Sequence, residues 1–193
     1  MASIITATTT SGLTQSADNS GVLQLASGTG NLVTVPSVTG TAMVSGNMPA
    51  FSAFRSGTQT LTDGVSQKLQ YNAENFDTAN CFDSTTNFRF TPNVAGYYQI
   101  NLVIQIVSLT SGRNYVVVPM VYKNGSRVIG YEYDFNHWND TIGFTLSWFG
   151  EMNGTTDYLE AYAYFDDVTA GGTGGFSGST LASMFSGFLV RAS

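Results

Sequence analysis

The segment from Tyr97 to Ile106 constrains the fold more than any other part of the chain. It places Ile100, Leu102, Ile104 and Ile106 at every second position, so an extended strand would present all of them on one face. Similar short runs follow one another, separated by Gly, Asn and Asp, at 68–71, 87–91, 116–122, 128–133, 141–149, 158–165 and 183–191. No stretch shows a helical period. Many short strands joined by turns predict an all-β sandwich or jelly roll.

Charge is scarce in this chain. Charged residues make up 10% of the sequence, against about 25% in an average soluble domain. The net charge of −6 and the scattered Lys and Arg residues argue against nucleic acid as a partner, because phosphate binding needs clustered basic side chains. No apolar run reaches the roughly 18 residues of a membrane helix, so we expect no membrane insertion.

The composition changes at Met48–Pro49. Residues 1–48 carry a single charged side chain, Asp18, among Thr, Ser, Gly, Ala and Val. Two apolar stretches bounded by turn residues read as short strands. Such a segment cannot bury a core alone, so we expect an extended arm that docks on another surface by strand addition. A linker without a partner is the alternative. The residues expected to dock are Val22, Leu23, Leu25, Leu32, Val33 and Val35.

Residues 49–193 resemble the globular head of complement component one q. The resemblance lies in the segments Pro49–Phe54, Phe82–Asp83, Phe88–Tyr98, Lys123–Gly125 and Ser183–Val190, which occur in the order of that family. It implies a ten-strand jelly roll of the tumour necrosis factor type, assembled as a compact homotrimer. The side chains expected in its core are Phe51, Phe88, Phe90, Tyr97, Ile100, Leu102, Phe185 and Phe188.

The chain departs from that family in two places. The segment from Met152 to Asp157 replaces the usual Gly-Asp pair, and the 1–48 arm stands where a collagen-like stem would be. The Thr-, Ser- and Gly-rich arm is similar in composition to segments of tailed-phage virion proteins. No basic and apolar secretion signal is visible at the N-terminus, so we expect assembly in a host cytoplasm.

The sequence offers little for catalysis. His137 is the single histidine and Cys81 the single cysteine, so no disulfide or histidine dyad can form within one chain. Cys81 reads as a small buried apolar side chain. Asp166 and Asp167 are adjacent and would point to opposite faces of a strand. Loop carboxylates suit calcium, but no EF-hand spacing is present. We therefore predict no catalytic residue, no metal site and no cofactor.

These features lead to two functional hypotheses. The first is a non-enzymatic virion protein, a trimeric knob whose arms bind the major capsid protein or another virion protein as a decoration or cement. The alternative is the receptor-binding tip of a phage tail fibre, which recognises a host glycan or protein. Its candidate binding loop, between two strands, contains Phe135, His137, Trp138 and Asn139, since exposed aromatic rings suit sugar faces.

Overall fold

The computed structural model describes residues 23–26, 32–35, 48–137, 141–169 and 171–193. Within these residues the secondary structure is all β. The strands are β1 (Leu23–Ala26), β2 (Leu32–Val35), β3 (Ala50–Phe54), β4 (Gln59–Thr62), β5 (Val65–Lys68), β6 (Ala73–Asp77), β7 (Phe82–Asp83), β8 (Arg89–Phe90), β9 (Gly96–Val107), β10 (Arg113–Lys123), β11 (Ser126–Gly130), β12 (Tyr133–His137), β13 (Ile142–Met152), β14 (Leu159–Asp167), β15 (Thr173–Phe176) and β16 (Met184–Ala192).

The chain divides into two units, residues 1–40 and 41–193. In the first unit β1 and β2 pair with each other antiparallel, with Leu23 opposite Val35. The two predicted arm strands therefore form a hairpin, a pairing that the sequence did not indicate. Val22 lies outside the described residues. The predicted domain boundary at Met48–Pro49 stays a prediction, because residues 41–47 also lie outside them.

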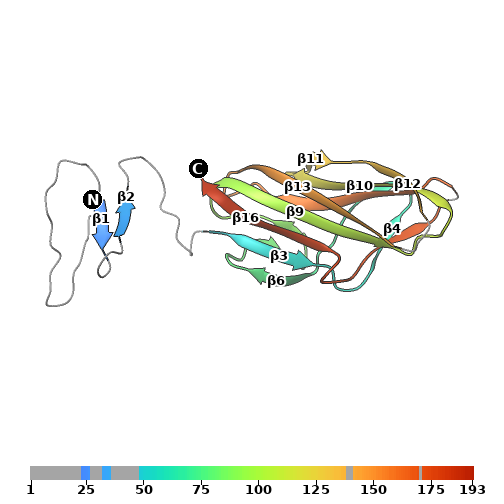
Figure 1. Ribbon diagram of the computed structural model, residues 1–193, viewed down its shortest axis with the longest axis horizontal. Helices are drawn as coiled ribbons and strands as arrows, with labels where there is room; N and C mark the ends of the chain where they lie inside the picture. Colours follow the sequence, from blue (N-terminus) through green and yellow to red (C-terminus); the bar gives the residue numbers. More distant parts are fainter. Residues whose placement is uncertain (1–22, 27–31, 36–47, 138–140, 170) are drawn as a thin grey trace. The chain divides into compact units, whose positions relative to one another are not determined.

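The second unit is a sandwich of two antiparallel sheets (Figure 1). The β9 sheet has the order β4-β15-β9-β16-β3-β6, with β13 on the other edge of β9. The β10 sheet has the order β11-β10-β14-β8-β7, with β12 also on β10 and β5 also on β14. Short strands such as β7 and β8 form within connections, which is why the sandwich holds more than the ten predicted strands.

Aromatic rings from both sheets fill the space between them. The Phe51 ring of β3 stacks on Phe90 of β8 at 4.4 Å and on Phe82 of β7 at 5.0 Å between ring centroids. Phe185 of β16 meets Phe51 edge-on at 5.2 Å. Pairs of this geometry contribute about 0.5–1.5 kcal/mol each beyond the area they bury.

The predicted core is correct at five positions and wrong at three. Phe51, Phe90, Ile100, Leu102 and Phe185 are buried, as is Cys81. Tyr97 and Phe188 are exposed, because they alternate with the inward-facing Tyr98, Phe185 and Leu189. Phe88 is half-buried and precedes β8 with a φ of 51°, so its backbone forms part of a turn and not of the strand.

Candidate functional site

Four strands of the β9 sheet carry almost no charge on their outward side. These strands, β3, β9, β13 and β16, contain Glu151 and Arg191 as their charged residues. Both lie near the end of the sandwich at which β3 begins, since Glu151 and Arg191 each pair with Tyr97. By contrast, β10 and β14 alone contain Arg113, Lys123, Glu160, Asp166 and Asp167. We call the outward side chains of β3, β9, β13 and β16 the uncharged face.

Four apolar side chains gather at one end of the uncharged face. Tyr97 is 37% exposed, Phe149 56%, Phe188 48% and Val190 49%. Strand register explains why they meet: Gln99 of β9 lies between Phe149 of β13 and Phe188 of β16. The rings of Tyr97 and Phe149 stack with centroids 6.1 Å apart and planes 15° apart. We call these four residues the aromatic patch.

Neutral polar side chains cover the next row of the same face. The Gln99 side-chain amide donates to Ser147 Oγ at 2.6 Å, and Ser147 Oγ donates to Asn101 Oδ1 at 3.1 Å. Ser186 occupies the matching position of β16, opposite Asn101. Neutral groups that already have hydrogen-bond partners can be buried at lower free-energy cost than charges. This row is therefore compatible with a covered surface.

The β13 strand forms a long free edge beside the uncharged face. It pairs with β9 over all eleven residues, Ile142 to Met152, without a register shift. Within the described residues its other edge has no strand partner. The strand contains no Pro or Lys, and its one charge, Glu151, lies near its end. Bulges, prolines and lysines are the usual devices that keep such an edge from pairing with another chain.

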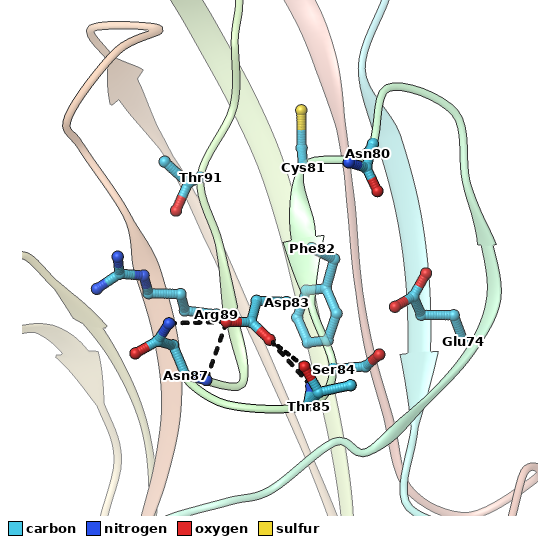
Figure 2. Close-up of a pocket in the computed structure, with 10 residues that line it drawn as sticks. All are labelled: Glu74, Asn80, Cys81, Phe82, Asp83, Ser84, Thr85, Asn87, Arg89 and Thr91. Carbon is cyan, nitrogen blue, oxygen red and sulfur yellow. Dashed lines mark hydrogen bonds between the residues drawn. The ribbon is translucent and has the colours of Figure 1, made fainter.

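A polar pocket lies beside the β7–β8 hairpin (Figure 2). Its central carboxylate, Asp83, accepts hydrogen bonds from the backbone amides of Thr86, Thr85 and Asn87, which together hold its pKa well below the usual range. The Cys81 thiol points away from this carboxylate (Figure 2), and burial raises its pKa. A raised thiol pKa lowers the thiolate fraction. The Asp83 carboxylate therefore stabilises a turn, and the Cys81 thiol is not positioned beside it as a nucleophile.

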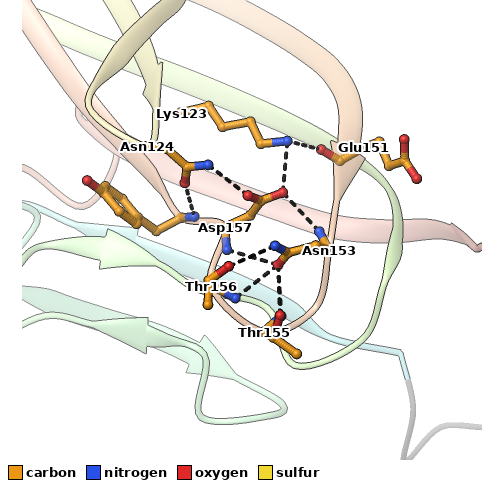
Figure 3. A network of polar contacts seen from close by, with 8 residues as sticks. Lys123, Asn124, Glu151, Asn153, Thr155, Thr156 and Asp157 are labelled. Carbon is orange, nitrogen blue, oxygen red and sulfur yellow. Dashed lines mark hydrogen bonds and ion pairs between the residues drawn. The ribbon is translucent and has the colours of Figure 1, made fainter.

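A second polar network joins the β10–β11 hairpin to the β13–β14 turn (Figure 3). Asp157 lies at its centre, 2.9 Å from Lys123 Nζ, and accepts from Asn124 Nδ2 at 2.7 Å and from the Asn153 amide at 3.0 Å. Asn153 Oδ1 accepts the backbone amides of Thr155, Thr156 and Asp157. These bonds fix the two turns, which argues for a structural role.

The predicted binding loop differs from the structure. Phe135 lies in β12, not in a loop, and its half-buried ring contacts Tyr115 and Phe144 at 6.1 and 5.9 Å. Packing against the core is the reason it extends as a strand. The backbone of His137 ends β12, opposite Arg113. Trp138 and Asn139 lie outside the described residues, and the binding role of these four residues stays a prediction.

The arm residues Leu23, Leu25, Leu32, Val33 and Val35 lie in β1 and β2, and their docking role stays a prediction.

The described residues contain no group of three or more His, Cys, Asp or Glu side chains that could hold a metal ion. In the same part of the chain, no helix has the length and apolar character needed to cross a membrane. Phe149 and the β13 edge were not predicted from the sequence, although the alternation of Thr145, Ser147 and Phe149 indicates their common face.

Comparisons with known proteins match the fold alone. No protein-family model and no curated protein sequence matches the chain. A structure of murine APRIL at pH 5.0 superposes with a TM-score of 0.53 at 5% identity, over 74% of this chain and 99% of that chain. The murine APRIL structure at pH 8.5 gives 0.51 at 6% identity over the same shares. The Eiger TNF structure from S. frugiperda gives 0.53 at 9% identity, over 76% of this chain and 93% of that one.

These likenesses confirm the predicted fold class, a tumour necrosis factor-like jelly roll. At such low identity they show the fold and not the function. The resemblance to the complement component one q head and the phage origin stay predictions.

Proposed function

We propose that this protein is a non-enzymatic structural knob that assembles with copies of itself through the uncharged face and the β13 edge. The observation that carries the proposal is the position of the aromatic patch, with Phe149 56% exposed, beside an unprotected eleven-residue edge strand. In a single chain these apolar side chains are exposed to water. In an assembly the same residues would be covered.

The chemistry of the face fits an interface between copies. The cores of protein interfaces are depleted in charge and enriched in Tyr, Phe and Trp. Tyr97, Phe149 and Phe188 supply the aromatic side chains, and the Gln99–Ser147–Asn101 row supplies satisfied neutral groups. A second copy of the chain brings the same low density of charge, so few charges need to be buried; Glu151 and Arg191 lie at the end of the face, beside Tyr97.

The trimeric state and the place of assembly are finer parts of the same proposal. The resemblance of residues 49–193 to the complement component one q head implies three copies. The low charge and strand-forming stretches of residues 1–48 support an arm that attaches the trimer to a virion, as a capsid decoration protein. Three arms on one trimer would convert weak single contacts into tight attachment.

Sedimentation of the full chain tests the assembly. We expect a mass three times the chain mass of 20.6 kDa. Phe149→Asp places a charge in the aromatic patch and should weaken assembly on the order of tenfold or more. Tyr131→Asp is the matched control, because Tyr131 is 64% exposed and lies outside the uncharged face. A monomeric wild type, or equal assembly by Phe149→Asp and wild type, would contradict the proposed interface.

Attachment requires a separate experiment. Purified protein is mixed with undecorated capsids, and bound protein is measured after sedimentation of the particles. We expect full-length protein to bind and a variant lacking residues 1–48 to remain in solution. Equal binding by the shortened variant would contradict the anchoring role of the arm, while leaving self-association intact.

A further inference from the structure

A groove crosses the outward face of the β10 sheet, opposite to the uncharged face. Its floor consists of alternate residues of β10 whose side chains point away from the sandwich core: Val116, Val118 and Met120. Although they face outward, Val118 is 7% exposed and Met120 2%. Outward apolar side chains with so little exposure are shielded by walls, so the groove is a built feature of the fold.

The groove lies where the partner of β10 is interrupted. β11 pairs with β10 up to Gly130, opposite Met120, and β12 begins at Tyr133, opposite Val117. Between them β10 contributes Val118 and Pro119, and proline has no amide hydrogen to donate to a ladder. Two residues separate β11 from β12, and the second of them, Glu132, lines the groove.

The walls carry charges of both signs. Arg127 and Glu132 line one side, and Tyr164 and Asp166 of β14 line the other. Tyr164 donates its hydroxyl hydrogen to Asp166 Oδ2 at 3.1 Å, and this bond raises the tyrosine pKa, with further contributions that include the Glu132 charge. The ion pairs of the described residues involve Lys68, Arg113 and Lys123. Arg127, Glu132 and Asp166 form none among themselves and keep hydrogen-bonding capacity.

We propose that this groove binds a neutral glycan. A sugar ring has an apolar C–H face, which suits the partly exposed Val116 and the Tyr164 ring. Its hydroxyl groups donate to carboxylates such as Asp166 and Glu132 and accept from the Arg127 guanidinium. A cation would bond to the two carboxylates alone and an anion to Arg127 alone, whereas a sugar can bond to all three. An uncharged ligand with many hydroxyl groups therefore uses the lining best.

The groove gives the alternative receptor-binding function a location that differs from the predicted loop. It does not require self-association, because it lies on the other sheet. A sugar site and an interface between copies can therefore coexist on one knob.

The experiment uses the full chain on an array of immobilised neutral oligosaccharides, followed by saturation-transfer NMR with methyl glycosides of glucose, galactose, mannose and N-acetylglucosamine. We expect binding to at least one neutral sugar, with magnetisation transferred to ring C–H protons. Asp166→Ala and Arg127→Ala should each weaken it about tenfold, the effect of removing one hydrogen bond to a charged group. Glu74→Ala is the control, an exposed carboxylate on β6 outside the groove.

Three outcomes would overturn the proposal: no neutral sugar bound, binding that neither groove variant changes, or binding of spermidine or citrate in place of sugars. Phe149→Asp separates the two proposals, since it should lose assembly and keep sugar binding. Thermal unfolding of each groove variant confirms that a lost signal is not lost folding, because Arg127 is exposed and Asp166 half-exposed.

Discussion

Asp83 and Asn87 are joined twice: Asp83 Oδ2 accepts the Asn87 backbone amide at 3.0 Å and its side-chain amide at 2.7 Å. The amides of Thr86 and Thr85 reach Oδ1 of the same carboxylate. These bonds hold the pKa of Asp83 well below its usual range. A depressed pKa means that the stabilisation is complete above the unfolded value of about 4 and is lost as pH falls towards the folded value.

We therefore expect the free energy of unfolding to fall as the pH drops below about 4. Asp83→Asn should lower the free energy of unfolding at neutral pH by about 1–2 kcal/mol and should show a smaller decrease on acidification than wild type. Denaturant unfolding at several pH values measures both. An acid dependence identical in the two proteins would show that Asp83 does not contribute to it.

The Asp157 network should respond unequally to removal of its members. Asp157→Ala leaves Lys123, Asn124 and the Asn153 amide without their acceptor, and we expect it to cost about 2 kcal/mol. Lys123→Met should cost less, about 1 kcal/mol, since it removes one partly exposed ion pair and one exposed hydrogen bond to the Glu151 carbonyl. Urea unfolding measures the two differences. A larger effect of the lysine variant would mean that the ion pair, and not the turn, is the main contribution.

Gly187 has no space for a side chain. A Cβ there would lie 2.3 Å from Ile100 Cδ1 and 2.9 Å from the Gln99 carbonyl oxygen. Gly187→Ala should destabilise the fold by roughly 1–3 kcal/mol through overpacking. Gly143→Ala in the same sheet is the control, because its nearest atom is 3.8 Å away. Equal melting temperatures for the two variants would contradict the packing described at Gly187.

Self-association should make the melting temperature depend on protein concentration. Binding between folded copies stabilises the folded state by mass action. Calorimetry over a hundredfold range of concentration should therefore show a rising transition for wild type and a flat one for Phe149→Asp. A flat response of the wild type would indicate either a monomer or an assembly that does not dissociate on unfolding, and sedimentation at the lowest concentration distinguishes these.

Local periodicity was sufficient to predict the long strands β9, β10, β13, β14 and β16 and five of the eight expected core positions, but not the short strands β4, β6 and β15. The alternation in β9 correctly placed Ile100 and Leu102 inward. The same parity puts Tyr98 inward and Tyr97 outward, and it separates Phe185 from Phe188. Tyr97 and Phe188 were expected in the core because their rings are large, but alternation along each strand places them on the outward face. In water, the pleat of the strand decides which side chain is buried.

The candidate sites required the tertiary pairing. Nothing local to Ile142–Met152 says that β13 has one partner among the described strands, because that depends on which distant strands align with β9. The groove is non-local in the same sense, since Val118 and Met120 are shielded by residues from β14 and from the segment after β11. Local sequence predicts a loop at Phe135 because its packing partners Tyr115 and Phe144 are remote in sequence.

The regular β13 edge also makes a chain that has not assembled prone to unwanted strand pairing. Among the described strands the outer edge of β13 is unpaired over eleven residues, with no proline, lysine or bulge, so another extended segment can pair with it. If copies assemble as proposed, assembly would cover this edge, and an assembly-defective variant would leave it open to aggregation. Phe149→Asp would then be harmful in the cell for what it leaves uncovered, and wild-type copies made at the same time should rescue it in part.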